Sequence, residues 1–154
     1  MALFSEEVLQ KKSVVRLNVW HRKKARRTAL QALYQYFLTR EEIHLIAAQF
    51  QADTHIKRID MDYFHVLFRG VVEKQQELDQ LLAPHITRDA DMLDQIEQII
   101  LYIAALEFLY KETPPKVIIN EAVDLAKSFA AEDSYKYINA VLNNMLFGRH
   151  KHPS

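Results

Sequence analysis

Cysteine is absent from this chain, which excludes disulfide bonds, thiolate metal ligands and a cysteine nucleophile. Glycine occurs only twice, as Gly70 and Gly148. Glycine-rich phosphate loops and dinucleotide-binding motifs need several glycines at fixed spacing, so the sequence contains neither. The scarcity of glycine also argues against an all-β chain with many tight turns.

Long hydrophobic runs are absent as well. The most apolar window, Ile99–Leu109, has 11 residues and already contains Glu107, whereas a membrane-spanning helix needs about 20 apolar residues. The first 20 residues lack the apolar run of a secretory signal. Together with the absence of cysteine, these features predict a soluble cytoplasmic protein.

Patterns typical of catalysis and metal binding are missing. The seven histidines show no HExxH or comparable ligand spacing, and no GxSxG motif is present. The paired acids Glu41-Glu42 and Glu132-Asp133 fall near predicted helix starts, where carboxylates favour the helix dipole. We therefore predict a protein that is not an enzyme and that needs no metal or other cofactor.

Hydrophobic residues recur at helical spacing through most of the chain, and no segment alternates with a period of two. With 154 residues, 49% of them apolar, we predict one all-α globular domain. The predicted helices cover residues 22–38, 41–50, 61–82, 92–111, 114–129 and 133–147, and 92–111 is the central buried helix. Residues 84–91 are the predicted break between two groups of helices.

Two finer predictions concern single residues. Thr113 is expected to cap the helix that follows it, with proline in the first turn. Gly70 interrupts a predicted helix at a cost of about 1 kcal/mol relative to alanine, and the predicted reason is the close approach of a neighbouring helix.

Charge is unevenly distributed. Residues 11–27 contain eight Lys and Arg residues and no acid, whereas residues 28–154 contain 12 basic and 18 acidic residues. A basic segment attached to an acidic body suits a phosphate backbone at one edge of the molecule only. We predict that this segment binds nucleic acid through Arg22, Lys23, Lys24, Arg26 and Arg27.

The register of the basic segment places Lys23, Arg26 and Arg27 on the same helix side as Leu30 and Leu33. Burying unpaired cations costs several kcal/mol each, so we predict that the helix overhangs the body and exposes these charges. The alternative is a solvated helix start whose Lys and Arg side chains form ion pairs with neighbouring Asp and Glu residues. Cations oppose the dipole at a helix N-terminus, which favours a binding role.

Two blocks of the sequence resemble the transcription antitermination factor NusB family. The first is HRKKARRTALQALYQYF and the second is NEAVDLAKSFAAEDSYKYINAVLNNM; the resemblance covers residues 21–147. Ala130 stands where a glycine is common in the family. The resemblance implies a compact fold of six to seven helices in two small packed bundles. It also implies binding of boxA-like single-stranded RNA in ribosomal RNA leaders, together with the ribosomal protein NusE, and through it contact with other Nus factors and RNA polymerase.

The resemblance also implies further site residues. Tyr137, with Asp133 and Lys136, is expected to stack a base and bind base edges, because an aromatic ring beside cations suits unpaired RNA. Tyr34 and Glu97 are candidates for the contact with NusE. Trp20 is either a base-stacking residue or a hydrophobic staple at the helix start.

Several alternatives stay open at this level. The chain could be a protein-interaction module whose basic segment binds an acidic partner without RNA. A regulator of duplex DNA is disfavoured, because no helix-turn-helix with a polar recognition helix is evident. The predicted domains are an extension at 1–20, expected to be a mobile arm or a short added helix, an RNA-binding domain at 21–148 and a flexible tail at 149–154. The sequence does not distinguish a monomer from a homodimer that covers the basic face.

Overall fold

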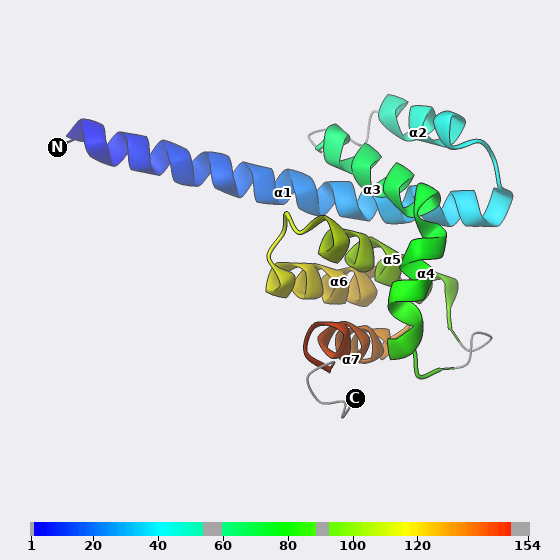
Figure 1. The fold of residues 1–154 in the computed structure, drawn as a ribbon. Helices are drawn as coiled ribbons and strands as arrows, with labels where there is room; N and C mark the ends of the chain where they lie inside the picture. Colours follow the sequence, from blue (N-terminus) through cyan, green and yellow to red (C-terminus); the bar gives the residue numbers. More distant parts are fainter. Residues whose placement is uncertain (1, 54–59, 89–92, 149–154) are drawn as a thin grey trace.

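A computed structural model describes residues 2–53, 60–88 and 93–148, with side chains from Val19 onward. Within these ranges the chain forms α-helices and one 3₁₀ helix, without a strand (Figure 1), so the all-α prediction is confirmed. The elements are α1 (Ala2–Thr39), α2 (Ile43–Ala52), α3 (Met61–Glu73), α4 (Gln75–Leu82), η1 (Ala83–His85), α5 (Gln95–Tyr110), α6 (Pro115–Phe129) and α7 (Ser134–Phe147). No described helix is both long and apolar enough to cross a membrane.

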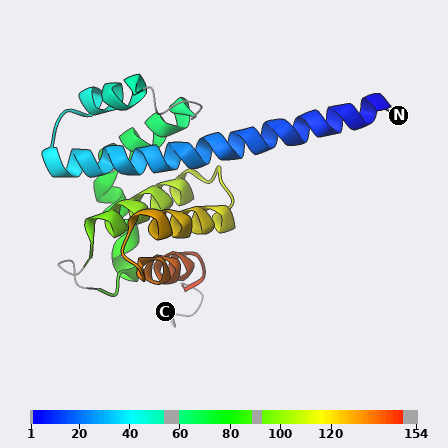
Figure 2. The ribbon, with the colours of Figure 1, turned by 180° about the vertical axis from the view of Figure 1, so that it is seen from behind.

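Helix α1 is continuous over 38 residues. Figures 1 and 2 show that its N-terminal half projects away from the other helices, while its C-terminal half packs against α2, α3 and α5. The sequence predicts a separate arm or added helix before residue 21, but residues 2–20 continue α1 instead. No glycine or proline precedes Gly70, so nothing in this segment interrupts a helix.

Helix α5 is buried on most of its circumference, as predicted for a central helix. It contacts α1, α3, α4, α6 and α7. Its first turn is fixed by a capping box, in which the Asp94 carboxylate accepts from a backbone N–H and the Glu97 carboxylate accepts from the Asp94 N–H. The helix ends at Tyr110, and Lys111 follows in the left-handed conformation with φ of 58°.

The predicted helix over residues 61–82 is divided at Lys74 into α3 and α4. Lys74 has φ of −107° and ψ of 17°, outside the α-helical range. The division lets α3 pack on α1 while α4 packs on α5. Gly70 lies in α3, and a Cβ there would come within 2.8 Å of Leu106 Cδ2 and 2.9 Å of the Tyr110 hydroxyl oxygen. The predicted close approach of a neighbouring helix is therefore confirmed, and the neighbour is α5.

Helices α6 and α7 form an antiparallel pair beside α5 (Figure 1). The prediction that Thr113 caps α6 was wrong, because the cap residue is Pro114 and α6 starts at Pro115. Proline still occupies the first turn, where its missing N–H is not needed. Ala130 ends α6 with φ of −100° and ψ of 176°. This extended conformation suits any residue, so the turn before α7 does not require glycine.

Candidate nucleic-acid interface

The five basic residues predicted to bind RNA from α1 have different surroundings. Arg26 is buried, with 3% of its surface exposed, and its partner Glu107 on α5 is 2% exposed. The Arg26 guanidinium donates hydrogen bonds of 2.8 to 3.1 Å to both Glu107 carboxylate oxygens. The Tyr63 hydroxyl of α3 donates to the same carboxylate. Arg26 thus joins α1 to α5 and α3.

The charges of this buried cluster stabilise one another. Burial lowers the pKa of Arg26, but the hydrogen bond and charge of Glu107 outweigh it and raise the pKa overall. Burial, followed by the charge of Glu107 and its hydrogen bond, raises the pKa of Tyr63 to about 12. Arg26 therefore stays charged and the Tyr63 hydroxyl keeps its proton at neutral pH, so both can donate to Glu107.

The prediction that Arg26 projects into solvent was wrong. Its register on the buried side of α1 is as the sequence indicates, but Glu107, 81 residues later, neutralises the charge there. The N-terminal half of α1 projects from the body (Figure 1), but Arg26 lies in the part of the helix that packs against α3 and α5. In this structure the Arg26 side chain is not available to an RNA phosphate.

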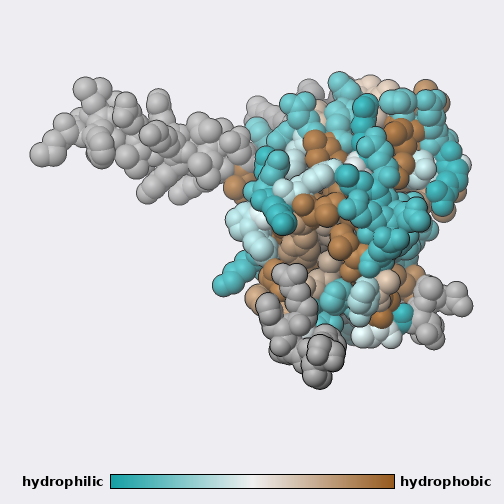
Figure 3. All heavy atoms as spheres, in the orientation of Figure 1, coloured by the Kyte–Doolittle hydropathy of each residue, from teal (hydrophilic) through white to brown (hydrophobic). Residues whose placement is uncertain are grey.

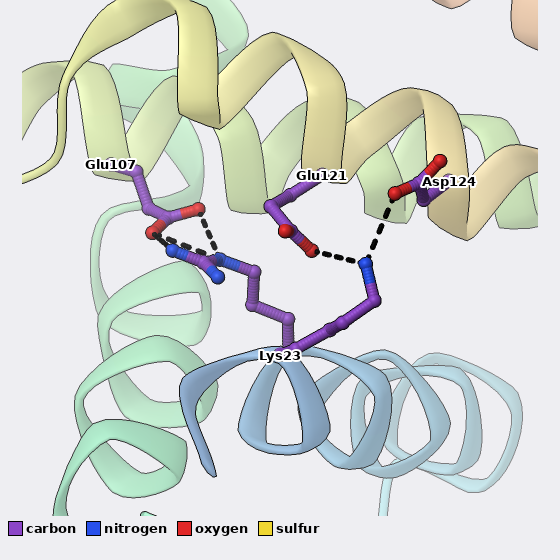
Figure 4. A network of polar contacts seen from close by, with 5 residues as sticks. Lys23, Glu107, Glu121 and Asp124 are labelled. Carbon is purple, nitrogen blue, oxygen red and sulfur yellow. Dashed lines mark hydrogen bonds and ion pairs between the residues drawn. The ribbon is translucent and has the colours of Figure 1, made fainter. Parts of the chain in front are cut away.

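Lys23 points from α1 toward α6, as Figure 4 shows, where its ammonium donates to Glu121 Oε2 at 3.2 Å and to Asp124 Oδ2 at 3.0 Å. Burial lowers the pKa of Lys23, but the hydrogen bonds and charges of these two carboxylates outweigh it, so the pKa is raised. Lys23 and Arg27 line a small cleft with these acids. Because the carboxylates would repel phosphate, an RNA backbone is expected to pass outside this cleft.

Arg22 faces the opposite side of α1, toward α3. Its Cζ lies 4.4 Å from the Tyr63 ring centroid, and its Nε lies 3.8 Å from an Asp60 carboxylate oxygen. The side chain is 39% exposed. Arg22 therefore keeps a partly accessible charge, but it does not share a face with the other accessible cations of α1.

Lys24 is half-buried and Arg27 is exposed, and no carboxylate forms an ion pair with either one among the described residues. Each lies over an aromatic ring: Lys24 Nζ is 4.8 Å from the Trp20 centroid, and Arg27 Cζ is 5.5 Å from the Phe129 centroid. Phe129 is the last residue of α6. The Arg27–Phe129 contact thus continues the exposed face of α1 onto the end of α6.

A second group of cation–aromatic contacts joins α6 to α7. Lys127 Nζ lies 4.9 Å from the Tyr135 centroid, and Lys136 Nζ lies 5.9 Å from it. Lys136 and Asp133 are both well exposed and form a loose ion pair of 3.6 Å. We call the two groups of contacts together the cation–aromatic strip; its residues are Trp20, Lys24, Arg27, Lys127, Phe129, Tyr135 and Lys136. Arg27, Lys127 and Lys136 are exposed and Lys24 is half-buried. The combination of accessible cations with aromatic rings is typical of surfaces that bind single-stranded nucleic acid.

Tyr137 is half-buried, and the cation over its ring is Arg88, which is not a residue of the strip. Its ring is covered by Arg88, whose Cζ is 4.0 Å from the centroid. The Arg88 N–H also donates to the Tyr137 hydroxyl oxygen at 3.5 Å. Arg88 is not predicted from the sequence, because its position after η1 carries no motif.

Glu97 is 2% exposed, so the expectation that it contacts a protein partner through its own carboxylate is not met in this structure. Both of its carboxylate oxygens accept from Arg88 Nη1 at 3.0 Å. Glu97 therefore holds Arg88 against Tyr137 and completes the capping box of α5. The Glu97 carboxylate is thus paired with a cation of its own chain.

Tyr34, the other candidate for a partner contact, is 39% exposed on α1. Leu38, one turn later on the same face, is also exposed. On the face shown in Figure 3, hydrophobic residues occur in separate patches between hydrophilic ones. Tyr34 and Leu38 thus form a small apolar surface on the same helix as Arg27.

Side chains for metal chemistry do not gather in the described ranges: no group there contains three or more His, Asp or Glu residues placed to hold a metal ion. His55, His150 and His152 lie outside the described residues, as does the predicted tail at 149–154.

Comparison with known proteins decides the family. The model of the NusB family matches residues 23–147. The chain belongs to the NusB family. It is 43% identical over 126 residues to the transcription antitermination protein NusB of Tolumonas auensis, covering 81% of this chain and 91% of that protein. It is also 43% identical over 125 residues to the NusB protein of Mannheimia succiniciproducens, covering 80% and 87%.

Two solved structures are similar to this fold. NusB of T. maritima aligns with a TM-score of 0.69 at 24% identity, covering 80% of this chain and 89% of that one. A structure of the antitermination factors NusB and NusE in complex with dsRNA aligns with a TM-score of 0.72 at 28% identity, covering 81% and 95%. The resemblance to the NusB family and its fold is confirmed, and so is the prediction of a non-enzymatic protein, since the relatives named above are transcription antitermination proteins.

The NusB family match includes most of the cation–aromatic strip. Lys24, Arg27 and the residues of α6 and α7 lie inside residues 23–147, whereas Trp20 lies before them. The Arg26–Glu107 pair and the Arg88–Glu97 pair also fall within the matched segment.

Proposed function

We propose that this chain is an RNA-binding transcription antitermination factor that binds boxA-like single-stranded RNA of ribosomal RNA leaders together with NusE. The observation that carries the proposal is the cation–aromatic strip, which links α1, α6 and α7 through contacts of 4.8 to 5.9 Å. Family membership supports it, because a related NusB was solved with NusE and dsRNA. Through NusE, the complex would act on RNA polymerase with other Nus factors.

The strip suits an unpaired strand for two reasons. Cations neutralise phosphates and release their counterions, and aromatic rings offer stacking to bases whose faces are free. A duplex hides those faces inside its own stack, so it would use only the cations. Arg27 is the central residue of this proposal, because it is exposed and joins α1 to Phe129.

Tyr137, Asp133 and Lys136 enter the proposal with different roles. Lys136 is well exposed and belongs to the strip. Tyr137 is held by Arg88 at the beginning of α7, so a base would meet the Arg88–Tyr137 pair rather than a free ring. Asp133 is exposed beside Lys136 and can accept from a base amino group.

Arg27→Ala tests the proposal. It should weaken binding of a single-stranded leader RNA carrying a boxA-like element by about five- to tenfold, as expected for loss of a cation and its stacking. Arg40→Ala is the matched control, because Arg40 is also exposed and also lies over aromatic rings, those of Tyr36 and Phe37, outside the strip. Fluorescence anisotropy of labelled RNA measures both variants.

The dependence on salt separates this function from its alternatives. With Arg26 buried and Lys23 paired, about three or four phosphate contacts remain, which gives a log–log slope of roughly −2 to −3 for a single strand. A protein-interaction module without RNA affinity would show no such binding. Equal competition by duplex RNA or duplex DNA would contradict single-strand recognition.

A further inference from the structure

Trp20 is an exposed aromatic residue that the family comparison leaves out. It lies three residues before the segment matched by the NusB family, and 51% of its surface is exposed. A hydrophobic staple needs a position next to a helix start, but Trp20 lies inside α1, which begins at Ala2. The reason for a large exposed ring here is therefore not helix capping.

The position of Trp20 aligns it with the cation–aromatic strip. Lys24 and Arg27 follow it at spacings of four and seven residues, so all three lie on one face of α1. Lys24 Nζ is 4.8 Å from the ring centroid. At 1.5 Å per residue, Trp20 is about 10 Å along the axis from Arg27.

We propose that Trp20 stacks an unpaired base while Lys24 binds the adjoining phosphate, so that the RNA-binding surface of this chain extends along α1 beyond the segment shared with the family. The inference rests on the proposed RNA-binding function. It adds one base position at the N-terminal end of the strip, where α1 leaves the body of the protein (Figure 1).

The charge of the surrounding sequence favours RNA as the occupant of this surface. Residues 11–27 contain eight basic residues and no acid, so a polyanion is attracted over the whole segment. The acids that neutralise Lys23 belong to α6 and face Lys23 itself. An unpaired strand alone offers both phosphate and an open base face, which matches the Lys24–Trp20 pair.

Trp20 is the single tryptophan of the chain, so its fluorescence reports on this position directly. Titration of the full-length protein with a single-stranded leader RNA carrying a boxA-like element should quench the emission as the base stacks on the indole. Affinity is measured separately with labelled RNA. Trp20→Ala should weaken binding at least about fivefold, the lower end of the cost of removing a base-stacking ring, and Trp20→Phe should restore most of it.

Val19→Ala is the matched control, since Val19 is the exposed neighbour on a different side of α1. Normal RNA affinity of Trp20→Ala, with unchanged wild-type emission at RNA saturation, would overturn the inference. If Arg27→Ala still weakens binding in that case, the proposed function stands without it. Absence of RNA binding by the wild-type protein would overturn both. Quenching by an acidic protein but not by RNA would assign the surface to a protein partner instead.

Discussion

Neighbouring arginines on one helix can have different roles, and Arg26 and Arg27 illustrate this at the scale of single residues. Arg26 forms a buried pair with Glu107, whereas Arg27 is exposed over Phe129. The helical register separates them by about 100°. That rotation moves one guanidinium from the surface into the junction of α1, α3 and α5.

Arg26→Ala is expected to destabilise the protein by about 3–5 kcal/mol, because it leaves Glu107 buried without its cation. Arg27→Ala should change stability by no more than about 0.5 kcal/mol, as for most surface positions. Urea unfolding followed by circular dichroism measures both. An Arg26→Ala variant as stable as the wild type would show that Glu107 is hydrated or paired otherwise.

The sequence predicts some of these residue environments and misses others. The register places Arg26 on the apolar side of α1, and the buried Glu107 lies inside the most apolar window of the chain. A charged residue among apolar ones is unusual in both places, but the pairing of Arg26 with Glu107 depends on a tertiary contact between residues 81 positions apart. Arg88 carries no signal at all, since its role comes from Glu97 and Tyr137, which only the fold brings together.

Gly70 in α3 lowers helix propensity but leaves room for the neighbouring helix α5. Gly70 weakens a helix by about 1 kcal/mol relative to alanine, yet a Cβ there would meet Leu106 at 2.8 Å and Tyr110 at 2.9 Å. Both contacts come from α5. The glycine therefore lets two helices approach closely at the expense of helix propensity.

Gly70→Ala should destabilise the protein by about 1 kcal/mol, because overpacking costs about 1–3 kcal/mol and exceeds the gain in propensity. Thermal or urea unfolding measures the change. In a double-mutant cycle, Tyr110→Phe should reduce the loss of stability caused by Gly70→Ala, because it removes the hydroxyl oxygen that the new Cβ would meet. A stabilised Gly70→Ala variant would mean that Leu106 and Tyr110 shift aside without loss.

Helix positions are predicted better than helix boundaries. Apolar spacing locates the segments that become α2, α5, α6 and α7, because each buries one face or nearly all of its surface. The division at Lys74 is not evident, since Val71, Leu78 and Leu82 keep helical spacing across it. The start of α1 is missed for the opposite reason: the N-terminal half of the helix projects away from the other helices (Figure 2), so no packing partner for it could be predicted from the sequence.

Helix α1 carries both proposed binding surfaces of the molecule, the cation–aromatic strip and the apolar surface at Tyr34. The cation–aromatic strip reaches Arg27, and Tyr34 follows seven residues later on the same face, about 10 Å along the axis. An RNA on the strip and a protein on Tyr34 would therefore lie side by side. Joint binding can then exceed either affinity alone, because each bound partner raises the local concentration of contacts for the other.

Glu97 is a poor position at which to test the protein surface, although the sequence analysis selected it. A Glu97→Lys substitution would bring a second cation to Arg88 and remove the capping box of α5. A loss of NusE binding in this variant could therefore result from lower folding stability as well as from a lost contact. Tyr34 is exposed and belongs to neither the Arg26–Glu107 nor the Arg88–Glu97 ion pair, so it reports on the surface alone.

Tyr34→Ala should leave the affinity for RNA alone within about twofold of the wild type, because the ring lies beyond the strip. Binding of NusE should weaken by about 1–2 kcal/mol, as expected when an interface aromatic is truncated. Linkage then requires that NusE increase RNA affinity less in the variant than in the wild type. Calorimetry measures the affinity for NusE, and fluorescence anisotropy measures the affinity for RNA without NusE and with NusE present.

Leu45→Ala is the control, because Leu45 is an exposed apolar residue on α2. It should change none of these three affinities. If Tyr34→Ala binds NusE at full strength, the protein surface lies elsewhere on the acidic body.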